Sequence, residues 1–120
     1  MMGKILIIED EPHISKLVAY LLQKGGYAVV QAVDGKKGIA AAKKELPDLI
    51  LLDVMMPGMD GFTVAKALRE DKRTSAIPIL MLSSAAQYKD RIKGISSGAT
   101  DYLTKPFEPK ELLQKVSQHL

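Results

Sequence analysis

The sequence contains no cysteine and no long hydrophobic run. The first absence excludes disulfides, thiolate metal sites and thiol nucleophiles. The second excludes a transmembrane helix, because a helix that spans the membrane needs about 20 predominantly apolar residues. A strand pattern begins within a few residues of Met1, which leaves no room for a signal peptide. We therefore expect a cytoplasmic protein that makes no contact with a membrane.

The sequence also lacks any cluster of basic residues. Lysine and arginine total 17 against 14 aspartate and glutamate residues, and the net charge is +3, but no basic run is longer than two residues. Binding to nucleic acid requires positive charge gathered on one surface. We therefore predict no direct contact with nucleic acid.

What the chain does contain is a regular alternation of short apolar runs and helical patterns. Strands are predicted over residues 5–8, 27–32, 49–52, 79–82 and 101–104, with the fourth opening at Ile77-Pro78. Helices are predicted over residues 12–24, 36–45, 62–70, 88–97 and 109–120. Five strand–helix units in a row predict an α/β domain, with a doubly wound parallel sheet that has helices on both faces. The candidate core contacts of the third helix are Phe62, Ala65 and Leu68. Helical spacing is followed in the first helix by Ile14, Leu17, Val18, Leu21 and Leu22, the second helix has a small face of Ile39, Ala40 and Ala42, and the last carries Leu112, Leu113, Val116 and Leu120.

Polar side chains follow four of the five predicted strands. Glu9 and Asp10 follow the first, Asp53 the third, Ser83 the fourth and Lys105 the fifth. In a parallel sheet the carboxyl ends of the strands lie along one edge, and ligands bind outside that edge. We therefore expect these side chains to converge on one small site.

Three carboxylates in one pocket need a compensating cation or a retained proton. Two unit charges about 4 Å apart repel by about 4 kcal/mol at an effective dielectric constant of 20. An all-oxygen donor set favours a hard cation, and Mg²⁺ fits best because it binds one or two carboxylates and keeps positions for water and phosphate. Simpler roles stay open for single residues: Asp10 as a helix cap, Ser83 in a cap region and Lys105 as a surface lysine. The Lys105–Pro106 bond could be cis.

The strand-end residues lie in four motifs, over residues 7–11, 48–61, 78–83 and 98–107. In this order and at these spacings, the motifs resemble the receiver domain of two-component response regulators over essentially the whole chain. The resemblance implies the flavodoxin-like (βα)5 fold, with strand order 2-1-3-4-5. It also implies a single receiver domain over residues 1–120.

The same resemblance implies a role for each acidic residue. Asp53 would accept the phosphoryl group, as the phosphorylated residue of a Mg²⁺-dependent reaction. Asp10, Asp53 and the backbone carbonyl of Met55 would bind the metal, with Glu9 acting nearby through water. Mn²⁺ is a possible substitute for Mg²⁺.

The remaining implied roles concern phosphate contact and the switch. Lys105 and Ser83 would contact phosphate oxygens, and Ser83 and Tyr102 would change position on phosphorylation. The changed surface, formed by the fourth helix, fifth strand and fifth helix, would control a downstream protein or an output domain. The donor would be a sensor histidine kinase or a histidine phosphotransfer protein. Self-phosphorylation from small phosphodonors and slow autodephosphorylation are expected, although the domain is not a conventional enzyme.

Two positions depart from the commonest pattern of the family. Ser83 replaces a threonine, a change that the family tolerates. Thr100 stands where many DNA-binding relatives carry an acid, which weakens the expectation of a homodimer, so a monomer or a phosphorylation-dependent homodimer is expected. The chain ends at Leu120 with no output domain. It is therefore a single-domain regulator, a receiver fragment of a longer DNA-binding regulator, or a phosphorelay intermediate.

Rival functions lack their own motifs. The turn Glu9-Asp10-Glu11-Pro12 has no glycines to hold a pyrophosphate, and no Walker A sequence occurs. A small-molecule phosphatase with an aspartyl nucleophile would need a general acid two residues after Asp53, where Met55 stands. A docking module independent of phosphorylation would not need the complete set of acidic and phosphate-contacting residues.

Overall fold

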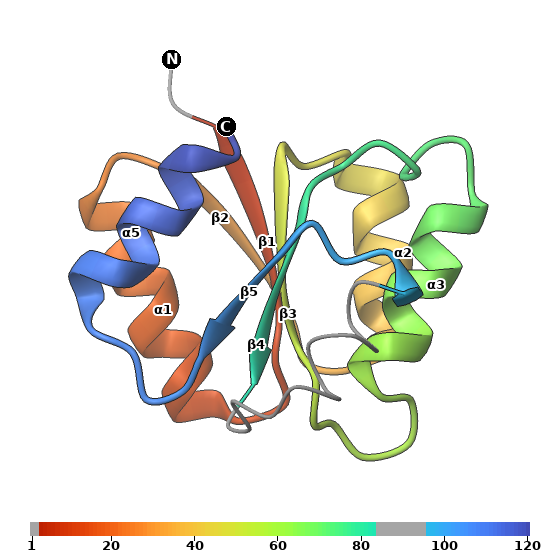
Figure 1. The fold of residues 1–120 in the computed structure, drawn as a ribbon, viewed down its shortest axis with the longest axis horizontal. Coiled ribbons are helices and arrows are strands. Elements are labelled where there is room, and N and C mark those ends of the chain that lie inside the picture. Colours follow the sequence, from red (N-terminus) through yellow and green to blue (C-terminus); the bar gives the residue numbers. More distant parts are fainter. Residues whose placement is uncertain (1–2, 84–95) are drawn as a thin grey trace.

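The computed structural model describes residues 3–83 and 96–120. Its strands are β1 (Lys4–Ile8), β2 (Ala28–Ala32), β3 (Leu49–Asp53), β4 (Ile79–Ser83) and β5 (Asp101–Thr104). They form one parallel sheet in the order β2-β1-β3-β4-β5 (Figure 1). The predicted fold class and strand order are therefore confirmed.

Helices cover both faces of this sheet. The described helices are α1 (Pro12–Lys24), α2 (Gly35–Glu45), α3 (Gly61–Glu70) and α5 (Pro109–Gln118). Helices α1 and α5 pack on one face, and α2 and α3 pack on the other (Figure 1). The helix predicted over residues 88–97 lies outside the described residues, except for Ser96 and Ser97, which are helical.

Successive residues of β1 pack alternately into two separate hydrophobic cores. Ile5 and Ile7 pack with α1 and α5, whereas Leu6 and Ile8 pack with α2 and α3. This alternation follows from the two-residue period of a strand. A strand buried on both faces therefore reads as a continuous apolar run, which is why β1, β3 and β4 are visible in the sequence.

The helices begin at capping side chains that lie in the loops after the strands. Glu11 accepts a hydrogen bond from the amide of His13 (3.1 Å), Asp34 from that of Lys37 (2.7 Å) and Asp60 from that of Thr63 (2.9 Å). Such a cap is worth about 1 kcal/mol. Because Asp34 and Asp60 are the caps, α2 and α3 each begin one residue earlier than predicted.

Some residues that follow the helical spacing are not buried. Leu17 is 54% exposed and Leu120 is 49% exposed. Ala40 is also exposed. The buried residues of α1 are Ser15, Val18, Ala19 and Leu22, so Val18 and Leu22 are buried as predicted, and Ser15 accepts a hydrogen bond from Gln31 of β2 at 2.8 Å. No helix in the described ranges has the length and apolar character needed to cross a membrane.

Candidate functional site

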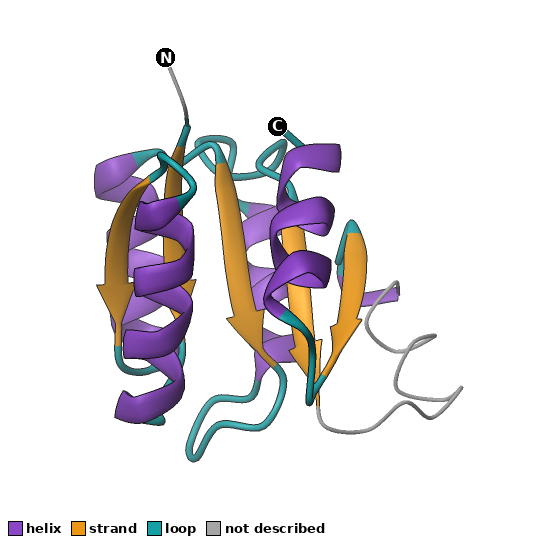
Figure 2. Ribbon diagram, turned by 90° about the vertical axis from the view of Figure 1, so that its left-hand side faces the viewer, coloured by secondary structure: helices purple, strands orange, loops and turns teal. Residues whose placement is uncertain are grey.

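The carboxyl ends of the strands meet at one edge of the sheet. The register pairs Ile8 with Leu52 and Asp53 with Leu82, and it pairs Ser83 with Thr104. Figure 2 shows the arrowheads of the strands pointing to this common edge. The predicted convergence of the strand-end residues is therefore a consequence of the register.

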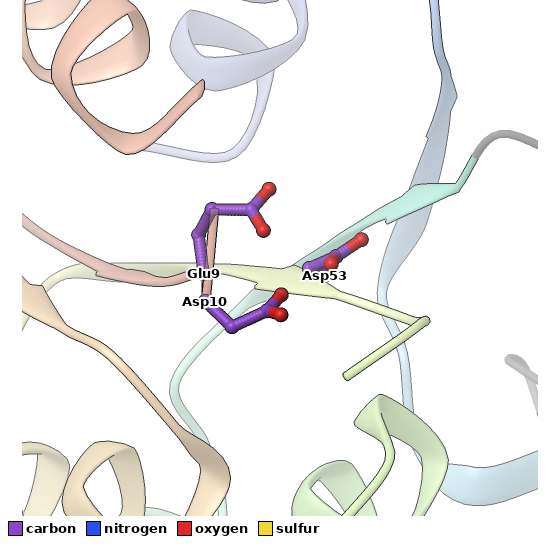
Figure 3. Close-up of side chains that lie close together, drawn as sticks. All are labelled: Glu9, Asp10 and Asp53. Carbon is purple, nitrogen blue, oxygen red and sulfur yellow. The ribbon is translucent and has the colours of Figure 1, made fainter. Parts of the chain in front are cut away.

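Glu9, Asp10 and Asp53 form an acidic cluster at this edge. One carboxylate oxygen from each residue lies within 4.8 Å of the others. Figure 3 shows the three carboxyl groups gathered around the ends of β1 and β3. Glu9 and Asp53 are only 2% and 5% exposed, whereas Asp10 is more open to solvent. The cluster thus combines two buried acids with one accessible acid.

Lys105 joins two of these acids directly. Its Nζ donates to Oε1 of Glu9 at 3.0 Å and to Oδ1 of Asp53 at 3.0 Å. The amide of Glu11 donates to the second oxygen of Glu9 at 3.2 Å. Lys105 therefore belongs to the site and is not an isolated surface lysine.

Burial and neighbouring charge change the ionisation of this group of residues. Burial, assisted by the charge of Asp53, raises the pKa of Glu9 to about 7, although the hydrogen bonds from Lys105 and the Glu11 amide oppose the change. Burial alone would lower the pKa of Lys105, but its hydrogen bonds to Glu9 and Asp53 outweigh that effect and raise it. Lys105 is therefore a firmly charged cation in the pocket.

The charge of the pocket fits a divalent cation. With Lys105 charged, the pocket has a formal charge of −2 when all three carboxylates are ionised and −1 when Glu9 keeps its proton. All three acidic side chains offer oxygen atoms, which hard cations prefer. The acidic triad could therefore bind Mg²⁺, with one accessible side where Asp10 lies.

The other predicted site residues are Ser83, Met55 and Tyr102, and they differ in burial and in their position relative to the strand ends. Ser83 ends β4 and is 1% exposed, and its carbonyl accepts a hydrogen bond from the amide of Lys105 at 2.6 Å. Met55 lies in the loop after β3 and is 71% exposed. Tyr102 pairs with Met81, two residues before the end of β5, and packs half-buried against the core under α2 and α3. Tyr102 is thus set back from the strand ends.

The structure decides two local alternatives that the sequence left open, and it shows one contact that was not predicted. Glu11 caps α1, so the alternative role of Asp10 as a cap is wrong. The Lys105–Pro106 peptide bond is cis. The direct ion pair between Glu9 and Lys105 was not predicted, because no local pattern connects two residues that are 96 positions apart.

An apolar hollow beside Lys105 was also missed. It has a volume of about 350 Å³ and is lined by Ile14, Leu17, Lys105, Pro106 and Phe107. Its walls come from α1 and from the segment after β5. The one available signal was the pair of apolar positions Ile14 and Leu17 near the start of α1, which follow the helical spacing.

Residues 5–117 match the family model of the response regulator receiver domain. The chain belongs to this family. It is 56% identical over 115 residues to the DNA-binding dual master transcriptional regulator RpaA of Synechocystis, covering 96% of this chain and 48% of that protein. The chain spans about half the length of the first curated relatives that it matches.

Solved structures agree with this assignment. The chemotaxis protein CheY4 of Vibrio cholerae superimposes with a TM-score of 0.96 at 38% identity, covering all of both chains. The receiver domain of sensor histidine kinase PA1611 of Pseudomonas aeruginosa gives a TM-score of 0.92 at 29% identity, covering 99% of this chain and 98% of that one. That structure has a magnesium ion coordinated in its active-site cleft. The chain is therefore a receiver domain, a phosphorylation switch whose acidic pocket is consistent with a magnesium site.

Proposed function

We propose that Asp53 accepts a phosphoryl group from the phosphohistidine of a histidine kinase or a histidine phosphotransfer protein. A carboxylate oxygen of Asp53 forms the new bond to phosphorus, and the phosphorus–nitrogen bond to the donor imidazole breaks. The observation that carries this proposal is the shared contact of Lys105 Nζ with Asp53 and Glu9, 3.0 Å from each, in a pocket of three carboxylates. Phosphoryl transfer depends on positioning and charge neutralisation, and this arrangement supplies both.

Each neighbour of Asp53 has a separate task in this proposal. Asp10, Asp53 and the carbonyl of Met55 would hold Mg²⁺, or Mn²⁺ in its place, with Glu9 close by. The metal, when bound, supplies positive charge to the transferred phosphoryl group. Lys105 leaves its contact with the free carboxylate and binds a phosphoryl oxygen, while its ammonium group stays charged. Acetyl phosphate can replace the protein donor, and slow hydrolysis of the acyl phosphate resets the switch.

The output is a change of surface. Ser83 lies at the end of β4 and moves toward a phosphoryl oxygen, and Tyr102 of β5 turns inward as space opens behind it. The surface around β5 and α5, with the segment between β4 and β5, then presents a different face to a downstream target or an output domain. The shift is limited by the difference between the contacts that the phosphoryl group makes in the two states.

A second candidate is that this receiver is one part of a longer DNA-binding regulator. The identity of 56% to RpaA over only 48% of that protein favours this possibility. In that case the target of the changed surface is a domain of the same chain. The chemistry at Asp53 is the same in either case. It is also the same if the chain acts as a phosphorelay intermediate.

The test compares wild type with Asp53→Asn in Mg²⁺ and acetyl phosphate. We expect wild type to gain the mass of one phosphoryl group and the variant to gain none. Treatment with hydroxylamine, which cleaves acyl phosphates, should remove the added mass. A phosphorylated Asp53→Asn protein, or an unmodified wild type at saturating phosphodonor, would contradict the assignment of Asp53.

A further inference from the structure

Arg69, near the end of α3, makes an unusual set of contacts. Its guanidinium donates to the carbonyls of Ile77 (2.7 Å), Gly98 (2.8 Å), Ser75 (3.1 Å) and Thr74 (3.4 Å), and to Oγ1 of Thr100 (3.3 Å). No carboxylate pairs with it in the described part of the chain. The side chain therefore acts as a hydrogen-bonding bracket between the α3–β4 loop and the segment that leads into β5. Figure 1 shows that segment beside α3.

Strand β5 needs such a bracket because its own register is weakly determined. It has four residues, pairs only with β4 and buries only Leu103. Backbone ladder bonds do not distinguish one register from another, since every residue offers the same donor and acceptor. Register is well specified only where side chains fit a single alignment.

The contacts of Arg69 are specific for one alignment. Gly98 has a φ of +111°, and a Cβ added there would lie 2.4 Å from Cγ of Arg69. Ser97 and Ala99, the neighbours of Gly98, both carry a Cβ and cannot take its place. A shift of β5 by one residue in either direction would therefore bring a Cβ to this position, and Arg69 or the segment itself would have to move.

Thr100 connects the segment before β5 to the first residue of β4. Its Oγ1 accepts from the amide of Ile79 at 3.0 Å, and its own amide donates to the carbonyl of Ile79 at 2.8 Å. Arg69 donates to the same hydroxyl oxygen. Thr100 thus holds both polar groups of the first residue of β4, a contact that a residue without a side-chain acceptor cannot make.

We propose that Arg69 and Thr100 are positioning residues that set the register of β5 and so hold Lys105 against Asp53. Lys105 follows the last residue of β5 and lies five residues after Thr100. A slip of one residue would move it by about 3.3 Å along the strand and turn alternate side chains to the other face of the sheet. That displacement exceeds the 3.0 Å contacts that Lys105 makes with Glu9 and Asp53. The inference rests on the proposed function, in which Lys105 binds the phosphoryl group.

The acidic cluster provides an internal reference. Glu9, Asp10 and Asp53 lie at the ends of β1 and β3, which pair with each other, whereas the hydrogen bonds of Arg69 and Thr100 described above go to residues outside these two strands. Loss of the Arg69 and Thr100 contacts should therefore weaken binding of a phosphoryl analogue through Lys105 while leaving Mg²⁺ binding intact. A variant that only loosens the whole fold would not separate these two affinities.

The experiment uses the full chain with Thr100→Val, which removes the hydroxyl at similar volume, and Thr100→Ser, which keeps it. Arg69→Lys, which keeps the charge but loses the planar fork, is the second variant. Beryllofluoride binding in Mg²⁺ is followed by fluorine NMR, Mg²⁺ binding by the amide shifts of Asp10 and Asp53, and folding by urea denaturation. We expect Thr100→Val and Arg69→Lys to bind beryllofluoride on the order of tenfold more weakly. Thr100→Ser should match wild type, and none of the variants should bind Mg²⁺ alone more weakly than wild type, because displacement of the Lys105 ammonium removes no carboxylate ligand.

Other outcomes separate the inference from the proposed function. Unchanged beryllofluoride affinity in Thr100→Val, even with a lower urea midpoint, would overturn the inference and leave a purely stabilising role. A parallel loss of Mg²⁺ affinity would overturn it as well. A wild type that binds no beryllofluoride would overturn the proposed function, and the cross-strand NOEs between Met81 and Tyr102 would then still decide whether Thr100 sets the register.

Discussion

Glu9 is a site residue whose burial lowers the stability of the folded chain at neutral pH. It is buried beside Asp53, and among residues 3–83 and 96–120 only Lys105 and the amide of Glu11 support its charge. Burial raises its pKa to about 7, well above the value of about 4.3 expected in the unfolded chain. Between these two values the folded state binds more protons than the unfolded state. The contribution of Glu9 to stability is therefore fully present at low pH and is lost as the pH rises through 7.

The upward shift of the Glu9 pKa predicts how the free energy of unfolding depends on pH in the absence of metal. In EDTA, the free energy of unfolding should fall between pH 5 and pH 8, with a Glu9-dependent part on the order of 2 kcal/mol. Glu9→Gln should remove most of that part, because the amide does not titrate. Urea unfolding at the two pH values measures it, with the exposed Glu70→Gln as the control. An equally steep fall in Glu9→Gln would contradict the prediction.

Residue identity alone indicated which groups belong to the site, but not how they interact. The strand ends pointed to Glu9, Asp10, Asp53, Ser83 and Lys105 because the parallel sheet brings those ends together. The contact of Lys105 with Glu9 and Asp53 depends on where a long flexible side chain comes to rest, and the sequence contains no local sign of that. The left-handed backbone of Leu46 (φ 46°) at the end of α2 was equally invisible, since glycine is the usual residue there.

At the level of elements, burial on both faces made β1, β3 and β4 easy to predict, and the capping residues account for the small errors at helix starts. Helix α1 is the instructive exception. Its apolar positions exceed what its buried face can hold, so Leu17 and Tyr20 remain 54% and 59% exposed. Leu17 lines the hollow beside Lys105, and Lys105 contacts Asp53, so under the proposed function this part of α1 lies next to the site that the donor histidine has to reach. Sequence periodicity cannot separate an apolar residue of the core from one reserved for a partner.

A charge placed on this exposed part of α1 should impair only the protein donor. We predict that Leu17→Glu slows phosphotransfer from a cognate phosphohistidine protein by on the order of tenfold, because a carboxylate in an apolar contact loses its hydration. The rate with acetyl phosphate should not change, since the acidic cluster and Lys105 stay in place. Single-turnover transfer with both donors measures the difference, and Ala40→Glu on the exposed face of α2 is the control. Equal slowing with both donors would show that the substitution disturbs the site itself.

For the whole molecule, the fold class and strand order were predictable because five strand–helix units allow few parallel arrangements. What could not be predicted is how the positions of distant elements combine. Arg69 of α3, the segment before β5 and Lys105 after β5 are separated in the sequence, and only the assembled sheet links them. The site is therefore a property of the complete fold, although each of its residues follows a short local strand.

The clustered negative charges of the site destabilise the folded chain. This repulsion predicts how a bound metal ion changes the free energy of unfolding. Without metal, Asp53→Asn should be more stable than wild type, by on the order of 1 kcal/mol, because it removes one of three clustered negative charges. In the proposed function Mg²⁺ binds at Asp53 in the folded state alone, so at 100 times its dissociation constant it should stabilise wild type by about 2.7 kcal/mol. Asp53→Asn, with one ligand weakened, should gain much less, so the order of stability reverses when Mg²⁺ is added. Urea unfolding of both proteins in EDTA and in Mg²⁺ tests this reversal, with Glu70→Gln expected to follow wild type. If Mg²⁺ stabilised both proteins equally, Asp53 would not contribute to the metal site.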